Sequence, residues 1–184
     1  MPEAMHDRGR FWTPAPDWLE AALEGEGWRA RCIPSLGQTL VSGDLDAAFA
    51  ALAPGLREVG LWGVVGEGAA IVRIARDRAL IVSPSLPGIA PGWHGCFAAS
   101  PCDDAFTVIE LSGPAIREVA AQGTTADLEA GSRSAAVMFA GVSCLLYRTG
   151  EETARLHVES PLAAYMWTWL AGIAAGTSVE GASR

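Results

Sequence analysis

The strongest constraint on the fold lies in residues 105–128, which carry the signals of a strand, a tight turn and a short helix in direct succession. Apolar β-branched and aromatic side chains dominate 106–111, and Gly113 and Pro114 then end the strand and begin a helix. Apolar residues recur at helical spacing on one side of that helix, namely Ile116, Val119 and Ala120. The segment therefore predicts a strand that leads into an amphipathic helix.

The segments before this unit predict one further helix and several short strands. Residues 44–52 have helical apolar spacing, with Ser42 or Asp44 as the N-cap. Short apolar runs at 58–65, 70–74 and 79–82 are separated by turn residues and predict a three-stranded antiparallel meander. The proline- and glycine-rich residues 83–95 predict a loop.

The segments after the unit predict three strands and a last helix. Runs at 135–140 and 142–147 flank Gly141, which predicts a turn or bulge. Residues 153–159 alternate, so that Ala154, Leu156 and Val158 face inward while Arg155, His157 and Glu159 face outward. On this basis we expect His157 to face solvent. The order of elements predicts an α+β fold with helices packed on one face of an antiparallel sheet.

The first forty residues differ in composition from the rest. They are rich in proline, glycine and aromatic residues, including Trp12 and Trp18. We expect residues 1–40 to form an arm whose aromatic side chains are buried either on the chain's own surface or in a partner's groove. One domain is expected over 41–176, followed by a disordered tail at 177–184.

Charge and hydropathy exclude several classes of protein. The net charge of −8 argues against nucleic acid as a partner. The amino-terminal residues are polar and show no secretory signal, which predicts a cytoplasmic protein. Residues 161–177 are free of charge but contain Gly172 and Gly176, and we interpret them as a packed helix instead of a membrane anchor.

The sequence offers few candidates for catalysis or metal binding. It has no nucleophile elbow, P-loop, zinc-protease motif or dinucleotide fingerprint. Asp103 and Asp104 are adjacent carboxylates, and a strand-entry signal explains them better than a catalytic dyad. The cluster of His94, Cys96 and Cys102 has irregular spacing for zinc, so incidental cysteines are the preferred interpretation. No catalytic or metal-binding residue is predicted.

The last helix carries more apolar surface than a monomer needs. One helical stripe is expected to face the core and consists of Leu162, Tyr165, Met166, Trp169, Leu170 and Ile173. The reverse face is uncharged and consists of Ala164, Trp167, Thr168, Ala171 and Ala175. Small residues around one large aromatic residue are typical of a protein interface, so this face is predicted to dock on a larger subunit with Trp167 as the anchor. The alternative is that the arm of the same chain covers it.

Several of these motifs together resemble a known family. The L-S-G-P-A turn at 111–115 with Asp127-Leu128 resembles the aminomethyltransferase-like, folate-associated proteins. The segment 76–82, the Asp103-Asp104 pair and the aromatic segment 163–170 bring the chain closer to the gamma subunit family of heterotetrameric sarcosine oxidase. The resemblance covers roughly residues 55–175 and departs from the pattern at Ala105, where relatives often have a hydroxyl residue.

This resemblance implies a function and a set of partners. The chain would be a noncatalytic small subunit of a flavoenzyme complex in one-carbon metabolism, and larger partner subunits would hold flavin, NAD and tetrahydrofolate. Asp103 or Asp104 would then be the residues of any remaining folate site. The alternatives are a stand-alone folate-binding aminomethyltransferase-like enzyme and, more remotely, a cysteine-based metal or redox module.

Overall fold

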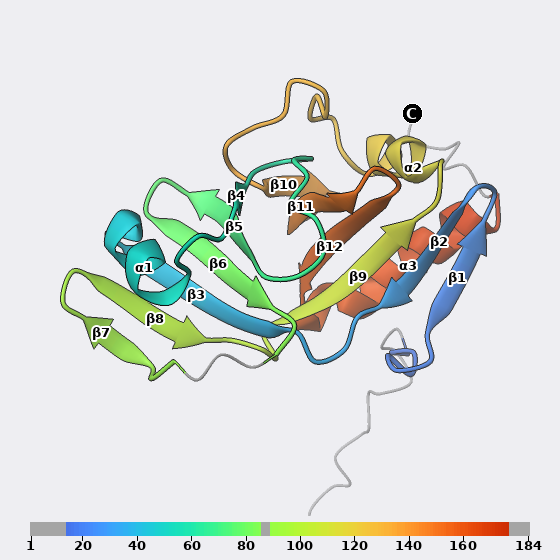
Figure 1. Cartoon of the computed structure of the whole chain (residues 1–184). Helices are drawn as coiled ribbons and strands as arrows, with labels where there is room; N and C mark the ends of the chain where they lie inside the picture. The colour runs from blue at the N-terminus through green and yellow to red at the C-terminus, as the bar shows by residue number, and fades with distance from the viewer. Residues whose placement is uncertain (1–13, 86–88, 177–184) are drawn as a thin grey trace, which may run out of the picture.

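Two six-stranded sheets make up most of the structure, a computed structural model that describes residues 14–85 and 89–176 (Figure 1). Sheet A contains, in spatial order, β1 (Ala22–Gly25), β2 (Trp28–Cys32), β9 (Phe106–Ser112), β12 (Thr153–Glu159), β11 (Val142–Gly150) and β10 (Ala136–Phe139). Sheet B contains β4 (Glu58–Val59), β5 (Ala70–Ala75), β6 (Arg78–Ser83), β3 (Gly37–Gly43), β8 (Phe97–Pro101) and β7 (Gly92–His94). The strand pairs are antiparallel except for β4 with β5. The predicted α+β class is confirmed, with a second sheet that the sequence did not predict.

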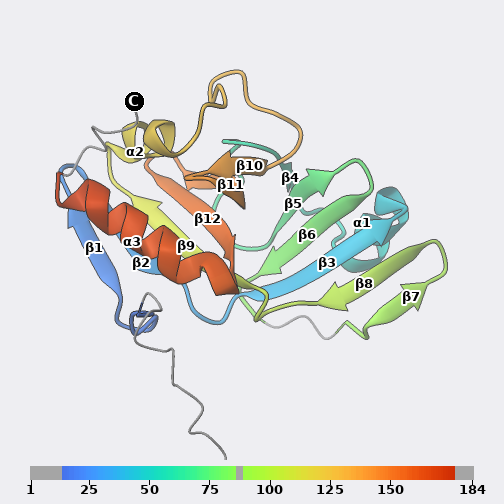
Figure 2. The same ribbon diagram turned by 180° about the vertical axis from the view of Figure 1, so that it is seen from behind.

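The helices cover the outer faces of the two sheets. The helices α2 (Ile116–Gly123) and α3 (Ala163–Ala174), the latter preceded by a 3₁₀ turn at Ser160–Leu162, pack on sheet A (Figure 2). The helix α1 (Leu45–Leu52) packs on sheet B. A third apolar cluster lies between the sheets and includes Leu80, Leu145 and Tyr147. The second face of sheet A is therefore partly buried as well.

The strand, turn and helix predicted for 105–128 are confirmed. The strand β9 leads through Gly113 and Pro114 into α2, whose buried residues are Ile116, Val119 and Ala120. Gly113 has a φ of 118°, and a Cβ atom there would lie 2.5 Å from the carbonyl oxygen of Gly27. A residue with a side chain would therefore both strain the backbone and clash at this turn.

Other local predictions are also confirmed. Asp44 caps α1 by accepting a hydrogen bond from the backbone N–H of Ala47. Residues 135–147 form a hairpin in which Ala140 and Gly141 have φ values of 49° and 82°, the left-handed backbone that a two-residue hairpin turn needs. No helix within the described ranges is long and apolar enough to cross a membrane.

The predicted amino-terminal arm is wrong over residues 22–40. The strands β1 and β2 belong to sheet A, β3 belongs to sheet B, and Trp28 and Ala30 are buried in the main core. The strand β2 pairs with β9, almost 80 residues further along the chain. Because that partner is so distant in sequence, composition alone does not reveal the strand. Residues 1–13, with Trp12, and the tail at 177–184 lie outside the described residues.

Two further predictions need correction. The run at 58–65 was expected to form an antiparallel meander with the next two, but β4 pairs with β5 in parallel. The predicted loop at 83–95 contains β7, which pairs with β8 at the edge of sheet B. Turn residues mark where a chain changes direction, but they do not specify the neighbour with which the next strand pairs.

Candidate binding cleft and contact surface

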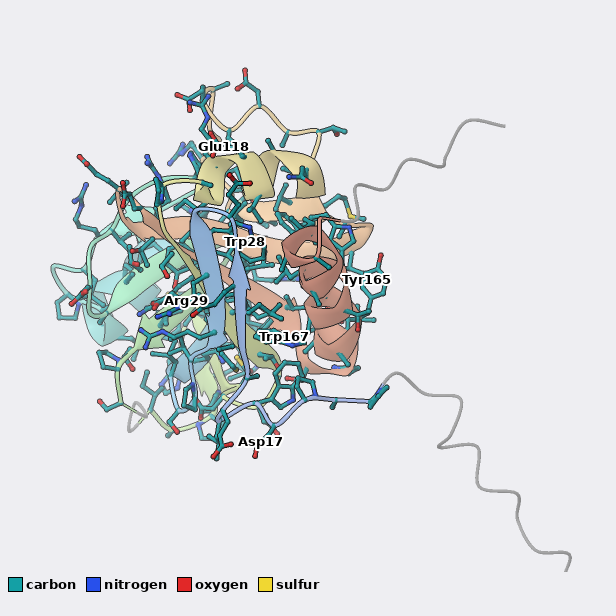
Figure 3. All side chains as sticks on the ribbon, turned by 90° about the vertical axis from the view of Figure 1, so that its right-hand side faces the viewer. Asp17, Trp28, Arg29, Glu118, Tyr165 and Trp167 are labelled. Atoms are coloured by element: carbon teal, nitrogen blue, oxygen red, sulfur yellow. The ribbon has the colours of Figure 1, made fainter. Side chains whose placement is uncertain are left out.

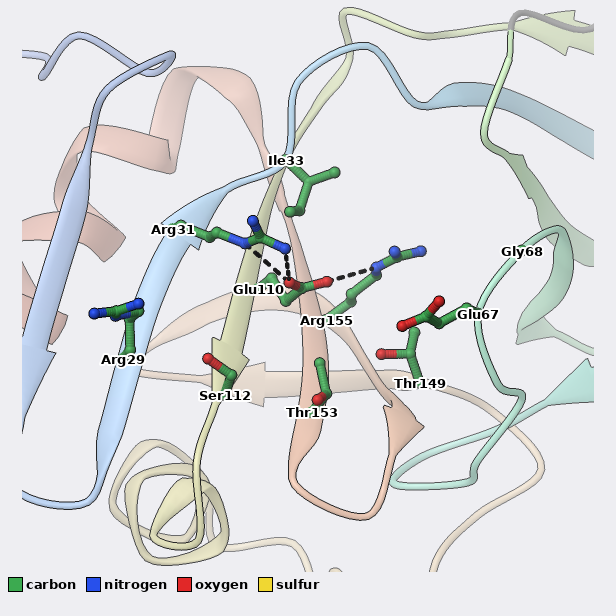
Figure 4. A pocket seen from close by; sticks show the side chains of 10 residues that line it. All are labelled: Arg29, Arg31, Ile33, Glu67, Gly68, Glu110, Ser112, Thr149, Thr153 and Arg155. Carbon is green, nitrogen blue, oxygen red and sulfur yellow. Dashed lines mark hydrogen bonds and ion pairs between the residues drawn. The ribbon is translucent and has the colours of Figure 1, made fainter.

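An open cleft of about 610 Å³ lies beside the exposed part of sheet A's second face (Figure 4). Side chains from β2, β9, β12 and the end of β11 line one side, and a loop from 65 to 69 contributes Glu67 and Gly68. The polar lining residues are Arg29, Arg31, Glu67, Glu110, Ser112, Thr149, Thr153 and Arg155. We call this region the Arg–Glu cleft.

Three charged residues on adjacent strands form the floor of the cleft. Glu110 on β9 lies directly opposite Arg31 on β2 and Arg155 on β12 in the strand register, so all three point to the same face. Arg31 donates from Nε and Nη2 to Glu110 Oε1, at 3.0 and 2.7 Å. Arg155 Nε lies 3.5 Å from Glu110 Oε2 and has no hydrogen-bond partner among the described residues. One carboxylate thus serves two guanidinium groups.

Two residues along β12 from Arg155, the same face of sheet A is closed. His157 was predicted to face solvent, but it is fully buried. Its Nδ1 lies 2.9 Å from Gln38 Oε1 on β3, and its Nε2 lies 3.1 Å from the hydroxyl of Tyr147 on β11. The outward face of β12 is buried here because sheet B packs against it, which an alternating pattern cannot reveal.

The directions of these hydrogen bonds follow from Gln38. Its Nε2 donates to the carbonyl oxygens of Asp103 and Phe106, which leaves Oε1 as an acceptor. His157 Nδ1 therefore donates to Gln38, and His157 Nε2 accepts from the Tyr147 hydroxyl. Burial, and the nearby Arg155, lower the pKa of His157 to about 3, while burial raises the pKa of Tyr147 to about 12. The chain of hydrogen bonds is neutral and links the two sheets.

The predicted ligand residues Asp103 and Asp104 lie in the turn between β8 and β9. They line a pocket of about 190 Å³, together with Trp18, Gln38 and Ser160. The Asp103 carboxylate accepts the backbone N–H of Gln38 at 2.5 Å, and the Asp104 carbonyl accepts the Ser160 hydroxyl at 2.7 Å. Their role in ligand binding stays a prediction, and the contacts observed here connect the two sheets.

His94, Cys96 and Cys102, the candidate metal-binding cluster, have different surroundings in the structure. His94 Nε2 lies 2.9 Å from the carbonyl oxygen of Ala90, and its ring stacks on Phe97. Cys96 is exposed, whereas burial raises the pKa of Cys102. Within the described parts of the chain, no three His, Cys, Asp or Glu residues are grouped so as to hold a metal ion.

The anchor predicted on the last helix lies inside the fold. Trp167 is only 9% exposed and packs edge to face against Trp18, with 5.9 Å between ring centroids (Figure 3). The alternative prediction, that the amino-terminal segment covers this residue, describes the structure. Trp167 and Trp18 therefore stabilise the chain's own core and offer little surface to a partner.

The exposed face of α3 is rotated about the helix axis relative to the face that the sequence predicted. Tyr165 and Leu162 were expected in the core, but they are 47% and 37% exposed, and Thr168 is exposed as well. Ala164 and Ala171 are half-buried. Figure 3 shows Tyr165 on the outer side of α3, from where its hydroxyl reaches the carbonyl oxygen of Ala140 in the turn between β10 and β11. We define the α3 outer face as Leu162, Tyr165, Thr168 and Ala175, the exposed residues among 162–175, and it has no charge.

Two comparisons with known proteins found similarities, one in sequence pattern and one in fold. A sequence model of the sarcosine oxidase, gamma subunit family matches residues 90–176. A chain in the structure of heterotetrameric sarcosine oxidase from Corynebacterium sp. U-96, in complex with pyrrole 2-carboxylate, is similar with a TM-score of 0.67 and 22% identity, over 88% of this chain and 91% of that chain. No curated protein matches the sequence. Residues 90–176 thus carry the pattern of the sarcosine oxidase gamma subunit family, on a fold shared with a chain of a heterotetrameric sarcosine oxidase, and the resemblance predicted from the sequence is confirmed.

Proposed function

We propose that this chain is a noncatalytic, gamma-type subunit of a heterotetrameric sarcosine oxidase-like flavoenzyme complex. The family match and the shared fold support this class of protein. The observation that carries the proposal is the α3 outer face, because residues 161–176 contain no charged side chain although part of the helix is exposed.

An uncharged helix face is unusual on a protein surface. Exposed helix faces normally carry charged residues, whereas the centre of a protein interface is depleted in charge and enriched in tyrosine. Tyr165 is held in place because its hydroxyl donates to the carbonyl oxygen of Ala140, at 2.7 Å. A fixed aromatic side chain of this kind loses little conformational entropy when a partner covers it.

The proposal assigns flavin, NAD and tetrahydrofolate to the larger partner subunits. The pocket at Asp103 and Asp104 supports this assignment for the folate. Its 190 Å³ is below the roughly 300–1,000 Å³ of usual ligand pockets, and the Asp103 carboxylate is already occupied by the Gln38 N–H. A cytoplasmic location belongs to the same proposal, and the four free thiols are of the kind that a reducing compartment maintains.

Co-purification of the tagged full-length chain from its native host tests the proposal. We expect larger, flavin-containing chains to be recovered with the wild-type protein. Thr168→Glu should reduce this recovery at least about tenfold, because burying an unpaired carboxylate in an interface costs several kcal/mol. The matched control is Gln122→Glu, which adds the same charge to the exposed side of α2.

The outcome distinguishes this function from its alternative. Unchanged recovery with Thr168→Glu, in a variant that unfolds like the wild type, would exclude the α3 outer face as the contact surface. If no flavoprotein is recovered with the wild type, and the isolated chain binds tetrahydrofolate at micromolar concentration, the stand-alone folate-binding function would replace the proposed one.

A further inference from the structure

The Arg–Glu cleft contains charge that the contact surface on α3 does not explain. Three arginines and two glutamates line it, and Glu24, which is not among the lining residues, neutralises one of the arginines. Arg29 is engaged by the exposed Glu24, and Glu67 forms no ion pair within the described ranges. Arg31 and Arg155 share Glu110 as their only carboxylate partner in the described structure. Because Glu110 lies closer to Arg31, the guanidinium of Arg155 has no carboxylate of its own in the described structure.

Arg155 interacts with the buried Tyr147 hydroxyl, but it has no close carboxylate partner in the described structure. Its side chain is 13% exposed, and its single carboxylate contact is 3.5 Å long. A charged group taken out of water in this way is stabilised when a counter-ion pairs with it. Figure 4 shows its terminal nitrogens directed away from Glu110 and into the cleft. A planar guanidinium edge of this kind matches the two oxygens of a carboxylate.

The remaining lining supplies further hydrogen-bond donors and enough space. Ser112, Thr149 and Thr153 provide hydroxyl groups beside the charged residues (Figure 4). The volume of about 610 Å³ lies within the usual range for small-molecule sites. The chain as a whole has a net charge of −8 and repels anions, so binding of an anion here requires local recognition.

From these observations we propose that the Arg–Glu cleft is a binding site for a small organic carboxylate, held between Arg155 and Arg31. This site is independent of the subunit function proposed above, because it lies on the opposite face of sheet A from α3.

Titration of the full-length protein with malonate tests the proposal, with sodium chloride at equal ionic strength as the blank. We expect saturable binding that Arg31→Gln weakens about tenfold or more, since a hydrogen bond to a charged group contributes roughly 1.5–3 kcal/mol. Arg31 is a suitable site for substitution because its side chain is 61% exposed. The control Arg117→Gln removes the same charge from an exposed ion pair that Arg117 on α2 forms with Glu129, and it should leave binding unchanged.

Arg155→Lys tests the geometry of recognition. It keeps the charge but loses the planar fork, so malonate binding should weaken while the protein stays folded. Crystals grown with malonate should show it between Arg31 and Arg155. The proposal is overturned by equal losses in Arg31→Gln and Arg117→Gln, by malonate bound only elsewhere, or by no saturation up to about 10 mM.

Discussion

Arg155 and His157 lie two residues apart on the same strand and the same face, yet their surroundings are opposite. His157 is fully buried in a neutral chain of hydrogen bonds that joins the sheets. Arg155 borders an open cleft and shares one carboxylate with Arg31. The difference arises where sheet B stops covering sheet A. Full burial favours neutral groups whose hydrogen bonds are all formed. A partly open site tolerates a charged group whose hydrogen-bonding capacity is not filled.

The largest effect on stability is expected at the closed end of this face, the buried part around His157. His157→Ala removes the donor to Gln38 Oε1 and the acceptor of the Tyr147 hydroxyl and opens a cavity, so the free energy of unfolding should fall by about 3–5 kcal/mol. Urea unfolding measures this change. Tyr147→Phe, which removes the hydroxyl that contacts His157 Nε2 and Arg155, should cost about 1–2 kcal/mol. A loss below that of Tyr147→Phe for His157→Ala would contradict the linking role of the imidazole.

The closed end should also respond to pH. The pKa of His157 is near 6.5 in the unfolded chain and about 3 in the folded protein. Between these values the unfolded state binds the extra proton, so stability from this group is complete above pH 6.5 and falls by up to about 1.4 kcal/mol per pH unit below it.

Unfolding free energies of the wild type and His157→Asn, measured from pH 7 to pH 4, test this expectation. The wild type should lose more stability than the variant on acidification, because asparagine does not titrate. Parallel pH profiles for the two proteins would show that His157 does not remain neutral in the folded state.

A smaller loss of stability is expected at the open end of this face, the Arg–Glu cleft. Glu110→Gln leaves Arg31 and Arg155 without their shared carboxylate, and we expect a loss of about 1–2 kcal/mol, limited by the exposure of Arg31. Added salt should recover part of the loss through screening.

Glu24→Gln is the matched control, because it breaks an ion pair in which both side chains are well exposed, and it should change stability little. Equal effects of Glu110→Gln and Glu24→Gln would show that solvent screens the charges on the cleft floor as well as those on the outer surface. The cleft and the buried surroundings of His157 would then differ less in electrostatic environment than their burial indicates.

Local structure was the part most accessible from sequence. The turn at Gly113, the cap at Asp44 and the hairpin at Gly141 depend on residues close in the chain, and all three are confirmed. For the candidate cleft, the pattern placed Arg155 outward but gave no sign that Arg31 and Glu110 would lie beside it. Those contacts join strands about 80 and 45 residues apart.

The amino-acid sequence by itself determined the class of fold, its local elements and the family resemblance, because these follow from short-range backbone preferences and from ordered motifs. Only the tertiary structure decided which surfaces are exposed to solvent. Trp167 is buried because Trp18 reaches it, and His157 is buried because β3 crosses above it. The period of a strand or helix separates one face from another, but only packing between distant segments determines which faces are covered.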